Sequence, residues 1–341
     1  MKIMSRPRGL ESVPSRRTMG RMAAHLPDLV AWREFALDVG DGHRLHVEQS
    51  GNPDGLPVVC LHGGPASGLS VAHRRFFDPA RYHVIQFDQR GCARSTPRGA
   101  TAYNTTAHLI DDIETLRTTL GIERWLVMGG SWGATLGLAY AATHPAACLG
   151  LLSRGVFLGS AAEVRALFEG HRDLSPAGHD LLALLAPAER RGALTEWVLE
   201  VMTGNDLAIQ TPVARAWQAW EGVLDGGPVP DLSVDEHPET ALARVDKYRV
   251  QAHYLARGCF LDALWWRGAV RALAGLPVAW LHGTDDRICP VENSRAAAAE
   301  GEGSLLVEVP DCRHNPFEAP MLEALRQATD HFAAHGRFDA P

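Results

Sequence analysis

The chain has 341 residues, 46% of them hydrophobic, and its 40 acidic side chains outnumber 33 lysines and arginines to give a net charge of −7 at pH 7. This balance excludes the clustered positive charge with which nucleic-acid-binding proteins contact phosphates. No run approaches the roughly 18 continuous apolar residues that span a membrane, so we expect a soluble protein without a membrane partner.

Residues 1–30 precede the first regular pattern, and we expect them to form a disordered extension. Basic side chains gather there, but no sustained apolar segment accompanies them, so a secretory signal is not expected. The first regular pattern is a β-hairpin. The alternating segments 35–39 and 44–48 flank a Gly40–Asp41–Gly42 turn, and Asp-Gly between such segments favours a hairpin.

The following segments predict an α/β sheet. Continuous apolar or aromatic runs at 57–61 and 82–87 are typical of buried parallel strands. Apolar side chains between 106 and 120 recur with the 3.6-residue period of an amphipathic helix. Because strands alternate with helices, we predict a mostly parallel sheet flanked by helices.

A change of composition interrupts this pattern after a strand-like run at 149–153. From about 161 to 258 the sequence is rich in Ala, Leu, Arg, Glu and Trp, and helix-like stretches occur at 163–168, 180–185, 193–202, 211–223 and 240–256. The α/β pattern then returns with strands predicted at 278–282 and 304–308 and a closing helix at 321–334. We therefore predict a core in two parts, residues 31–158 and 259–341, with an inserted helical cap at residues 159–258.

The segment Gly129–Gly133 predicts a sharp turn that carries a nucleophile. It follows the apolar run 124–128 and precedes the small-residue run 134–142, so it connects a strand to a helix. A serine on such a turn has its hydroxyl exposed, and the flanking glycines avoid clashes where strand and helix nearly touch. Ser131 is the candidate nucleophile, although a plain strand-to-helix turn has the same pattern.

A serine hydroxyl needs a base, and the base needs an orienting carboxylate. The loop after the strand predicted at 278–282 carries Asp286, and the loop after the next strand carries His314. Loops at the carboxyl ends of parallel strands converge, so we expect both residues to meet Ser131. Asp286 as a helix cap and His314 as a surface histidine are each plausible alone, but the order Ser, Asp, His is that of α/β-hydrolases. Asp285 is the alternative carboxylate.

Acyl transfer also needs donors for the developing oxyanion. The segment His62–Pro65 follows a predicted strand, and its glycines allow main-chain N–H groups to turn inward. We assign the oxyanion hole to the main-chain N–H groups of Gly64 and Trp132. The alternative, a phosphate-binding turn, is set aside because the chain has neither G-x-G-x-x-G nor a Walker lysine.

The cysteine pattern indicates neither a disulfide framework nor a metal site. Six cysteines are scattered without C-x-x-C pairing, and no H-E-x-x-H motif is present. We therefore expect no metal, no cofactor and a cytoplasmic location. The composition sets no oligomeric state and is compatible with a homo-oligomer.

Five segments of this sequence resemble the proline iminopeptidases (prolyl aminopeptidases), serine peptidases with the α/β-hydrolase fold. The segments are Leu61–Pro65, Phe87–Pro97, Gly129–Leu136, Trp217–Gly222 and Gly283–Pro290. The resemblance extends from about residue 34 to 330, and the Asp-Gln-Arg-Gly and Trp-Glu-Gly segments are more restrictive than the serine turn alone. It implies an enzyme that releases an N-terminal proline from short peptides through an acyl-enzyme, with a helical cap inserted in the fold.

The resemblance also implies substrate contacts. Glu221 matches a carboxylate that receives the substrate's free amine, whereas Gln251 stands where the family has a second glutamate. Phe157 and Cys289 match residues that line the proline pocket. Because a neutral acceptor binds an ammonium group less tightly than a carboxylate, we expect weaker or altered recognition of the amine.

Two further departures from the family pattern are Ala66 in the oxyanion loop and Arg313 beside the base, where glycines are usual. Arg313 is expected to modify the choice of substrate. The alternative function is an esterase or lactonase of the same fold that acts on small acyl compounds, and a binding protein without catalysis is disfavoured because no triad member is missing.

Overall fold

The computed structural model describes residues 30–171, 180–181, 183 and 186–339. The predicted extension 1–30 therefore lies outside the described residues except for its last residue. Most of the helix-like stretch predicted at 180–185 also lies beyond the described part.

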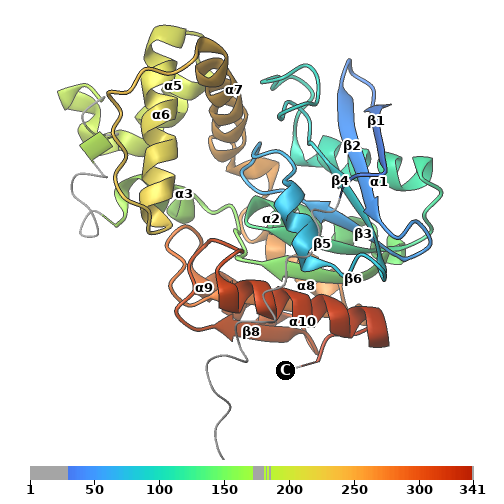
Figure 1. Cartoon of the computed structure of the whole chain (residues 1–341). Coiled ribbons are helices and arrows are strands. Elements are labelled where there is room, and N and C mark those ends of the chain that lie inside the picture. Colours follow the sequence, from blue (N-terminus) through green and yellow to red (C-terminus); the bar gives the residue numbers. More distant parts are fainter. Residues whose placement is uncertain (1–29, 172–179, 182, 184–185, 340–341) are drawn as a thin grey trace, which may run out of the picture.

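One eight-stranded sheet runs through the molecule in the order β1-β2-β4-β3-β5-β6-β7-β8 (Figure 1). The strands are β1 (Arg33–Asp38), β2 (Arg44–Gly51), β3 (Leu56–Leu61), β4 (Tyr82–Phe87), β5 (Trp125–Gly130), β6 (Cys148–Arg154), β7 (Val278–Gly283) and β8 (Leu305–Val309). β1 and β2 form the predicted hairpin, and β2 is antiparallel to β4, whereas all other neighbours are parallel. The predicted mostly parallel sheet is confirmed.

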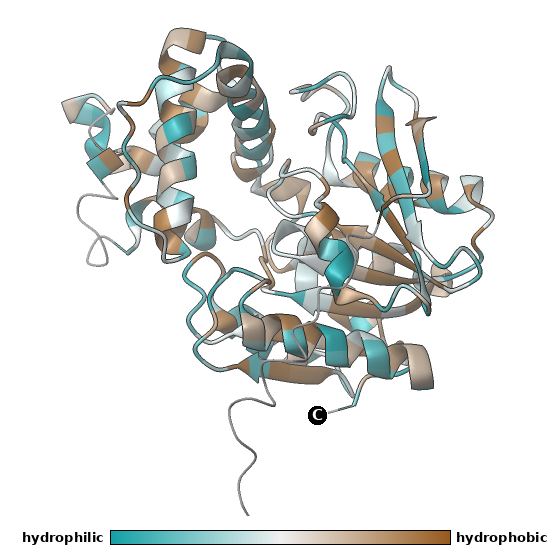
Figure 2. Cartoon of the chain, in the orientation of Figure 1, coloured by the Kyte–Doolittle hydropathy of each residue, from teal (hydrophilic) through white to brown (hydrophobic). Residues whose placement is uncertain are grey.

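Helices cover both faces of this sheet. On one face, α10 (Ala319–His335) and the 3-10 helix η2 (Val71–Phe76) join a hydrophobic cluster with strand side chains. The opposite face is covered by α1 (Thr106–Thr119), α2 (Trp132–Thr143), α8 (Trp265–Ala272) and α9 (Val291–Glu300). Figure 2 shows the central strands as largely hydrophobic, as expected of strands enclosed between two helical layers.

The chain leaves the sheet after β6 and forms helices that stand apart from it before β7 begins (Figure 1). These are α3 (Ala161–Glu169), α5 (Leu194–Thr203), α6 (Leu207–Leu224) and α7 (Pro238–Leu255). Within the described residues, the short 3-10 helices besides η2 are η3 (Pro145–Ala147), η4 (Ala188–Ala193) and η5 (Gly258–Phe260). An inserted helical layer is thus present, and its exact boundaries at 158 and 258 stay predictions.

The inserted helices pack around an aromatic centre. The ring of Trp217 on α6 lies 4.8 Å from that of Phe168 on α3 and 4.7 Å from that of Tyr248 on α7. All three side chains are buried, and such aromatic contacts add to the area that they remove from water. The packing fixes the faces of α6 and α7 that look toward the sheet.

The described part of the chain contains no helix that combines the length and the apolar character needed to cross a membrane.

Candidate active site

Ser131 stands on a strained turn between β5 and α2. Its φ of 56° and ψ of −126° lie outside the regions that side-chain-bearing residues favour. A Cβ added at Gly129 would lie 2.1 Å from the carbonyl oxygen of Gly133, and one added at Gly133 would lie 2.2 Å from that of Leu61. Strand and helix are therefore too close for side chains at these two positions, as the sequence predicted.

Asp286 and His314 are joined by a short hydrogen bond. The Nδ1 atom of His314 lies 2.7 Å from Oδ2 of Asp286. The other oxygen, Oδ1, accepts the main-chain N–H groups of Ile288 and Cys289, each at 2.9 Å. Asp285, the alternative carboxylate, is exposed and accepts a hydrogen bond from Thr284 instead. The geometry therefore places Asp286, and not its neighbour, against the histidine.

The charge of this pair is set by its surroundings. Burial opposes ionisation of Asp286, but the nearby His314 and His282, with their hydrogen bonds, outweigh it and hold the pKa of Asp286 well below its usual range. The carboxyl group is therefore ionised at neutral pH. It fixes the Nδ1 proton of His314 and leaves Nε2 as the basic atom.

Ser131 and His314 line the same cavity, but within the described residues no hydrogen bond joins them. The Oγ atom of Ser131 instead lies 4.0 Å from Sγ of Cys289. Catalytic hydrogen bonds are often long in the absence of substrate, so this separation is compatible with a base that engages when a substrate is bound.

The loop that carries Gly64 lies directly beside the serine. A Cβ added at Gly63 would approach Cβ of Ser131 to 3.3 Å, and Gly64 has a φ of 117°, which only glycine adopts readily. The main-chain N–H of Gly64 has no hydrogen-bond partner among the described residues. That of Trp132 belongs to the first turn of α2, where N–H groups lack a partner within the helix.

Gln89, which the sequence analysis left without a role of its own, ties these two donor segments together. Its Oε1 accepts the indole N–H of Trp132 at 2.9 Å, and its Nε2 donates to the carbonyl oxygen of His62 at 3.0 Å. Its own main-chain N–H donates to Nε2 of His62 at 3.1 Å. One buried side chain thus sets the distance between the serine turn and the glycine loop.

A cavity of about 410 Å³ lies between the sheet and the inserted helices. Seven of the nine predicted site residues line it: Gly64, Ser131, Phe157, Glu221, Gln251, Cys289 and His314. The remaining two, Trp132 and Asp286, are buried behind its wall. The structure therefore brings all of the predicted residues together around one cavity.

Glu221 and Gln251 form the polar wall on the inserted helices. The Oε1 atom of Glu221 accepts from Nε2 of Gln251 at 2.9 Å, and its Oε2 accepts from the hydroxyl of Tyr248 at 2.8 Å. Because a carboxylate cannot donate, the amide nitrogen of Gln251 must face it. The Oε1 atom of Gln251 is consequently left buried without a partner, as a free acceptor in the cavity wall.

Phe157 and Cys289 supply an apolar wall. Both are buried, with exposed fractions of 9% and 1%. Burial raises the pKa of the Cys289 thiol well above its ordinary value, so this sulfur stays protonated and acts as a small apolar surface rather than as a nucleophile.

Three charged residues of the cavity, Arg154, Glu163 and Asp225, were missed by the sequence analysis. Arg154, at the end of β6, is buried and donates from Nη1 to the carbonyl oxygen of His314 at 2.9 Å. Asp225 lines the cavity four residues after Glu221. The predicted helix ended at 223, and only the extension of α6 to Leu224 brings Asp225 one turn beyond Glu221.

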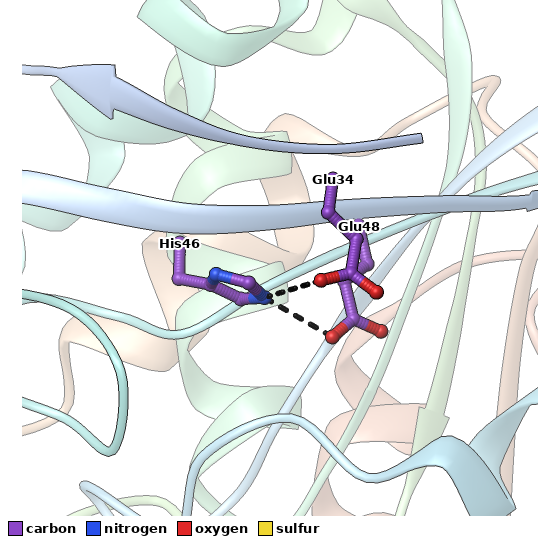
Figure 3. A group of neighbouring side chains, drawn as sticks. All are labelled: Glu34, His46 and Glu48. Atoms are coloured by element: carbon purple, nitrogen blue, oxygen red, sulfur yellow. Dashed lines mark hydrogen bonds and ion pairs between the residues drawn. The ribbon is translucent and has the colours of Figure 1, made fainter. Parts of the chain in front are cut away.

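Outside the cavity, three side chains of types that can bind a metal ion lie close together: Glu34, His46 and Glu48 (Figure 3). Nε2 of His46 lies 3.1 Å from Oε1 of Glu48 and 4.0 Å from Oε2 of Glu34. Glu48 is already paired with Arg74 and with Arg94, whose Nη1 lies 2.6 Å from Oε1. The positive charges of Arg74 and Arg94 would repel a metal ion at this position, so we assign the group to an ion-pair network.

Comparison with known proteins supplies the family. The family model described as "alpha/beta hydrolase fold" matches residues 57–319. The chain is 39% identical to the proline iminopeptidase of Xylella fastidiosa (strain 9a5c), over 90% of this chain and 98% of that protein. It is 35% identical to the proline iminopeptidase of Neisseria meningitidis serogroup B, over 88% of this chain and 96% of the relative.

Among solved structures, the proline iminopeptidase of Mycobacterium smegmatis aligns with a TM-score of 0.56 at 20% identity, covering 89% of this chain and 98% of that one. The esterase RhEst1 of Rhodococcus sp. ECU1013 aligns with a TM-score of 0.57 at 22% identity, over the same shares of the two chains. At these identities the two structures support the fold alone.

Proposed function

The chain belongs to the proline iminopeptidases of the α/β-hydrolase fold family, and we propose that it releases an N-terminal proline residue from short peptides through a covalent acyl-enzyme. The observation that carries the proposal is the position of Glu221. This carboxylate lines the same cavity as Ser131, on helices that cover the serine turn. A peptide whose free amine binds there presents its first carbonyl group to the serine.

The proposed chemistry begins with the hydrogen-bonded pair of Asp286 and His314. Asp286 holds His314 with Nε2 free, and this nitrogen takes the proton of Ser131 as Oγ attacks the carbonyl carbon. His314 then gives the proton to the departing amine. Water, activated by the same nitrogen, releases proline from the serine ester.

The main-chain N–H groups of Gly64 and Trp132 would bind the oxyanion that forms in each step. Such donors act because they are fixed before the reaction, and each is worth roughly 2.7 to 4 kcal/mol in transition-state stabilisation. The support for this role is Gln89, whose hydrogen bonds join both donor segments. It keeps the two N–H groups in place when the carbonyl oxygen becomes charged.

Recognition of the amine is assigned to Glu221 and Gln251. Glu221 uses its two oxygens toward Tyr248 and Gln251 and keeps further lone pairs, and Oε1 of Gln251 is an acceptor without a partner. Together they match the two N–H bonds of a protonated secondary amine. Phe157 and Cys289 would contact the apolar ring of proline.

The esterase or lactonase alternative does not require a buried charge in the acyl pocket. A neutral acyl group would leave Oε1 of Gln251 without a hydrogen-bond donor, which costs free energy. It would also form no charge-assisted bond with Glu221, whose nearest cation among the described residues is Nζ of Lys247 at 4.0 Å. A cytoplasmic location is part of the proposal. It is supported by the six cysteines, all of which are free thiols.

The test offers the purified protein arylamides of proline, alanine and N-blocked proline beside an aryl ester of a simple fatty acid. Cleavage that prefers proline with a free amine supports the proposal. Equal cleavage of the N-blocked and free proline arylamides would contradict amine binding by Glu221. Cleavage of the ester with no cleavage of any arylamide would favour the esterase.

A further inference from the structure

Asp225 is a charged group of the cavity that the proposed reaction does not use. It directly follows α6 and lines the cavity together with Ser131 and His314. Its Oδ1 atom is buried without a hydrogen-bond partner, and no ion pair to it is found within the described ranges. A carboxylate oxygen in this state is costly unless a positive group arrives from elsewhere.

The amine end of the substrate does not need Asp225. The acceptors for the amine, Glu221 and Gln251, are connected to each other between α6 and α7. Asp225 lies one helical turn farther along α6, on the same face as Glu221. The cavity therefore has a second acidic position beyond the amine-binding pair.

This second position faces the histidine loop. Gly226, the next residue, packs so closely against the guanidinium of Arg313 that an added Cβ would collide with it. Electrostatic interactions with His314 and Arg313 oppose the effect of burial on the pKa of the Asp225 carboxyl. Because His314 gives its proton to the departing amine, the residue after the cleaved bond lies on this side of the cavity.

Arg313 does not cancel the charge of Asp225. Its main-chain N–H donates to Oε2 of Glu318 at 2.8 Å and its Nε donates to Oε1 at 2.9 Å, so its charge is matched by Glu318. Burial raises the pKa of Asp225, and the positive groups opposite it lower the pKa only in part. Among the residues that the structure describes, no cation forms an ion pair with the carboxylate that Asp225 places on the leaving-group side of the cavity.

We propose that Asp225 selects the second residue of the substrate, favouring a lysine or arginine side chain after the N-terminal proline and disfavouring an acidic one. The inference rests on the proposed function, since it assumes that the bond after an N-terminal proline is cleaved. The cation would pair with Oδ1, which has no hydrogen-bond partner among the described residues.

The experiment compares Pro-Lys-amide, Pro-Leu-amide and Pro-Glu-amide with proline arylamide, which has no charged second residue. The wild type is expected to prefer lysine over glutamate. In Asp225→Asn the ratio of kcat/KM for these two peptides should fall roughly three- to tenfold, as for a partly screened ion pair. The value for the arylamide should change less than twofold.

The matched control is Asp235→Asn. Asp235 is exposed, belongs to the same inserted segment and does not line the cavity, so its replacement removes one charge without touching the substrate. Its Lys-to-Glu ratio should equal that of the wild type. Asp225→Ser, with thermal unfolding measured for every variant, provides a second replacement if the asparagine variant folds poorly.

Three results would overturn the proposal. The first is a Lys-to-Glu ratio of kcat/KM that stays unchanged in both Asp225 variants. The second is a loss of kcat/KM for proline arylamide as large as that for the lysine peptide, and the third is a fall of the Lys-to-Glu ratio in Asp235→Asn as large as that in Asp225→Asn. The second of these would make Asp225 part of the amine site, and the third would reduce its effect to the general field of the protein. Failure of the proposed function is distinguished from all three because the wild type would then leave proline arylamide intact.

Discussion

The amide of Gln251 donates to the carboxylate of Glu221, with Nε2 and Oε1 2.9 Å apart, and both side chains line the cavity that contains Ser131. This bond orients the amide, so its oxygen is the atom offered to a ligand. The family glutamate that Gln251 replaces would instead bring a second negative charge to the same place. Substitutions at Glu221 and Gln251 should therefore change the affinity for the amine of the substrate.

Gln251→Glu is expected to lower KM for proline arylamide about tenfold at pH 8, because a charge-assisted hydrogen bond to the ammonium group replaces a neutral one. Glu221→Gln should raise KM by a similar or larger factor. Steady-state kinetics on both variants check the prediction. A KM that does not move in either variant would show that the amine binds elsewhere.

Ser131→Ala should reduce kcat by at least about 10⁴-fold, because it removes the attacking oxygen. The fold should stay intact, because the only side-chain partner of this hydroxyl among the described residues is Sγ of Cys289 at 4.0 Å. Activity and thermal unfolding are measured on the same preparation. Ser233→Ala, at an exposed position of the inserted segment, is the control and should keep full activity. Normal turnover by Ser131→Ala would sink the proposed triad.

Asp286→Asn should lower kcat by roughly 10⁴-fold, since the amide favours the wrong proton position on His314. Asp285→Asn offers a matched control one residue away: the side chain is exposed, and within the described part of the chain no hydrogen bond or ion pair joins it to His314. It should change kcat less than twofold. Equal losses in the two variants would contradict the assignment.

Gln89→Leu should destabilise the protein by roughly 2 to 4 kcal/mol, because the buried indole N–H of Trp132 and the carbonyl oxygen of His62 lose their partners. We also expect kcat to fall more than KM rises, since the oxyanion donors lose their fixed separation. Urea unfolding and steady-state kinetics measure the two effects. A variant with a raised KM and an unchanged kcat would contradict this role.

His73 makes stability depend on pH. Burial, with help from Arg154 and His62, lowers its pKa to about 4, against roughly 6.5 in the unfolded chain. The unfolded chain then binds more protons between these values, so stability is highest above pH 6.5 and falls as the pH drops toward 4. When the pH is lowered from 7.5 to 4.5, the free energy of unfolding of His73→Gln should fall by roughly 1 to 3 kcal/mol less than that of the wild type. Urea unfolding at the two pH values measures the difference. Parallel curves for both proteins would contradict the prediction.

The strands and the serine turn were predictable because they depend on local patterns. Apolar runs marked β3 to β8, and the glycines around Ser131 marked the turn. The helices α8 and α9 were not predicted. α8 has eight residues and begins after Leu264, which has a positive φ, while α9 consists largely of alanine and polar residues without an apolar stripe. α8 packs on α2 and α9, whereas α9 packs on β7 and β8. Tertiary contacts therefore hold two helices that are too short to stand out as periodic segments of the sequence.

The site divides in the same way. Ser131, Asp286 and His314 each follow a strand, so chain order and strand ends were enough to bring them together. The links made by Gln89 and Arg154 depend on contacts between segments far apart in sequence, which a single sequence does not encode locally. The direction of the Gln251 amide was likewise inaccessible, because it follows from the position of the carboxylate opposite.

Because α6 and α7 are inserted between β6 and β7, the residues proposed for bond cleavage and those proposed for the choice of substrate lie on separate stretches of the chain. Bond cleavage resides on loops of the sheet, where close backbone contacts at Gly129 and Gly133 leave little room for variation. In the proposed function, the groups that bind the amine of the substrate, Glu221 and Gln251, lie on α6 and α7. Descendants of this protein can therefore acquire new substrates by altering one contiguous stretch of the gene while inheriting the reaction unchanged.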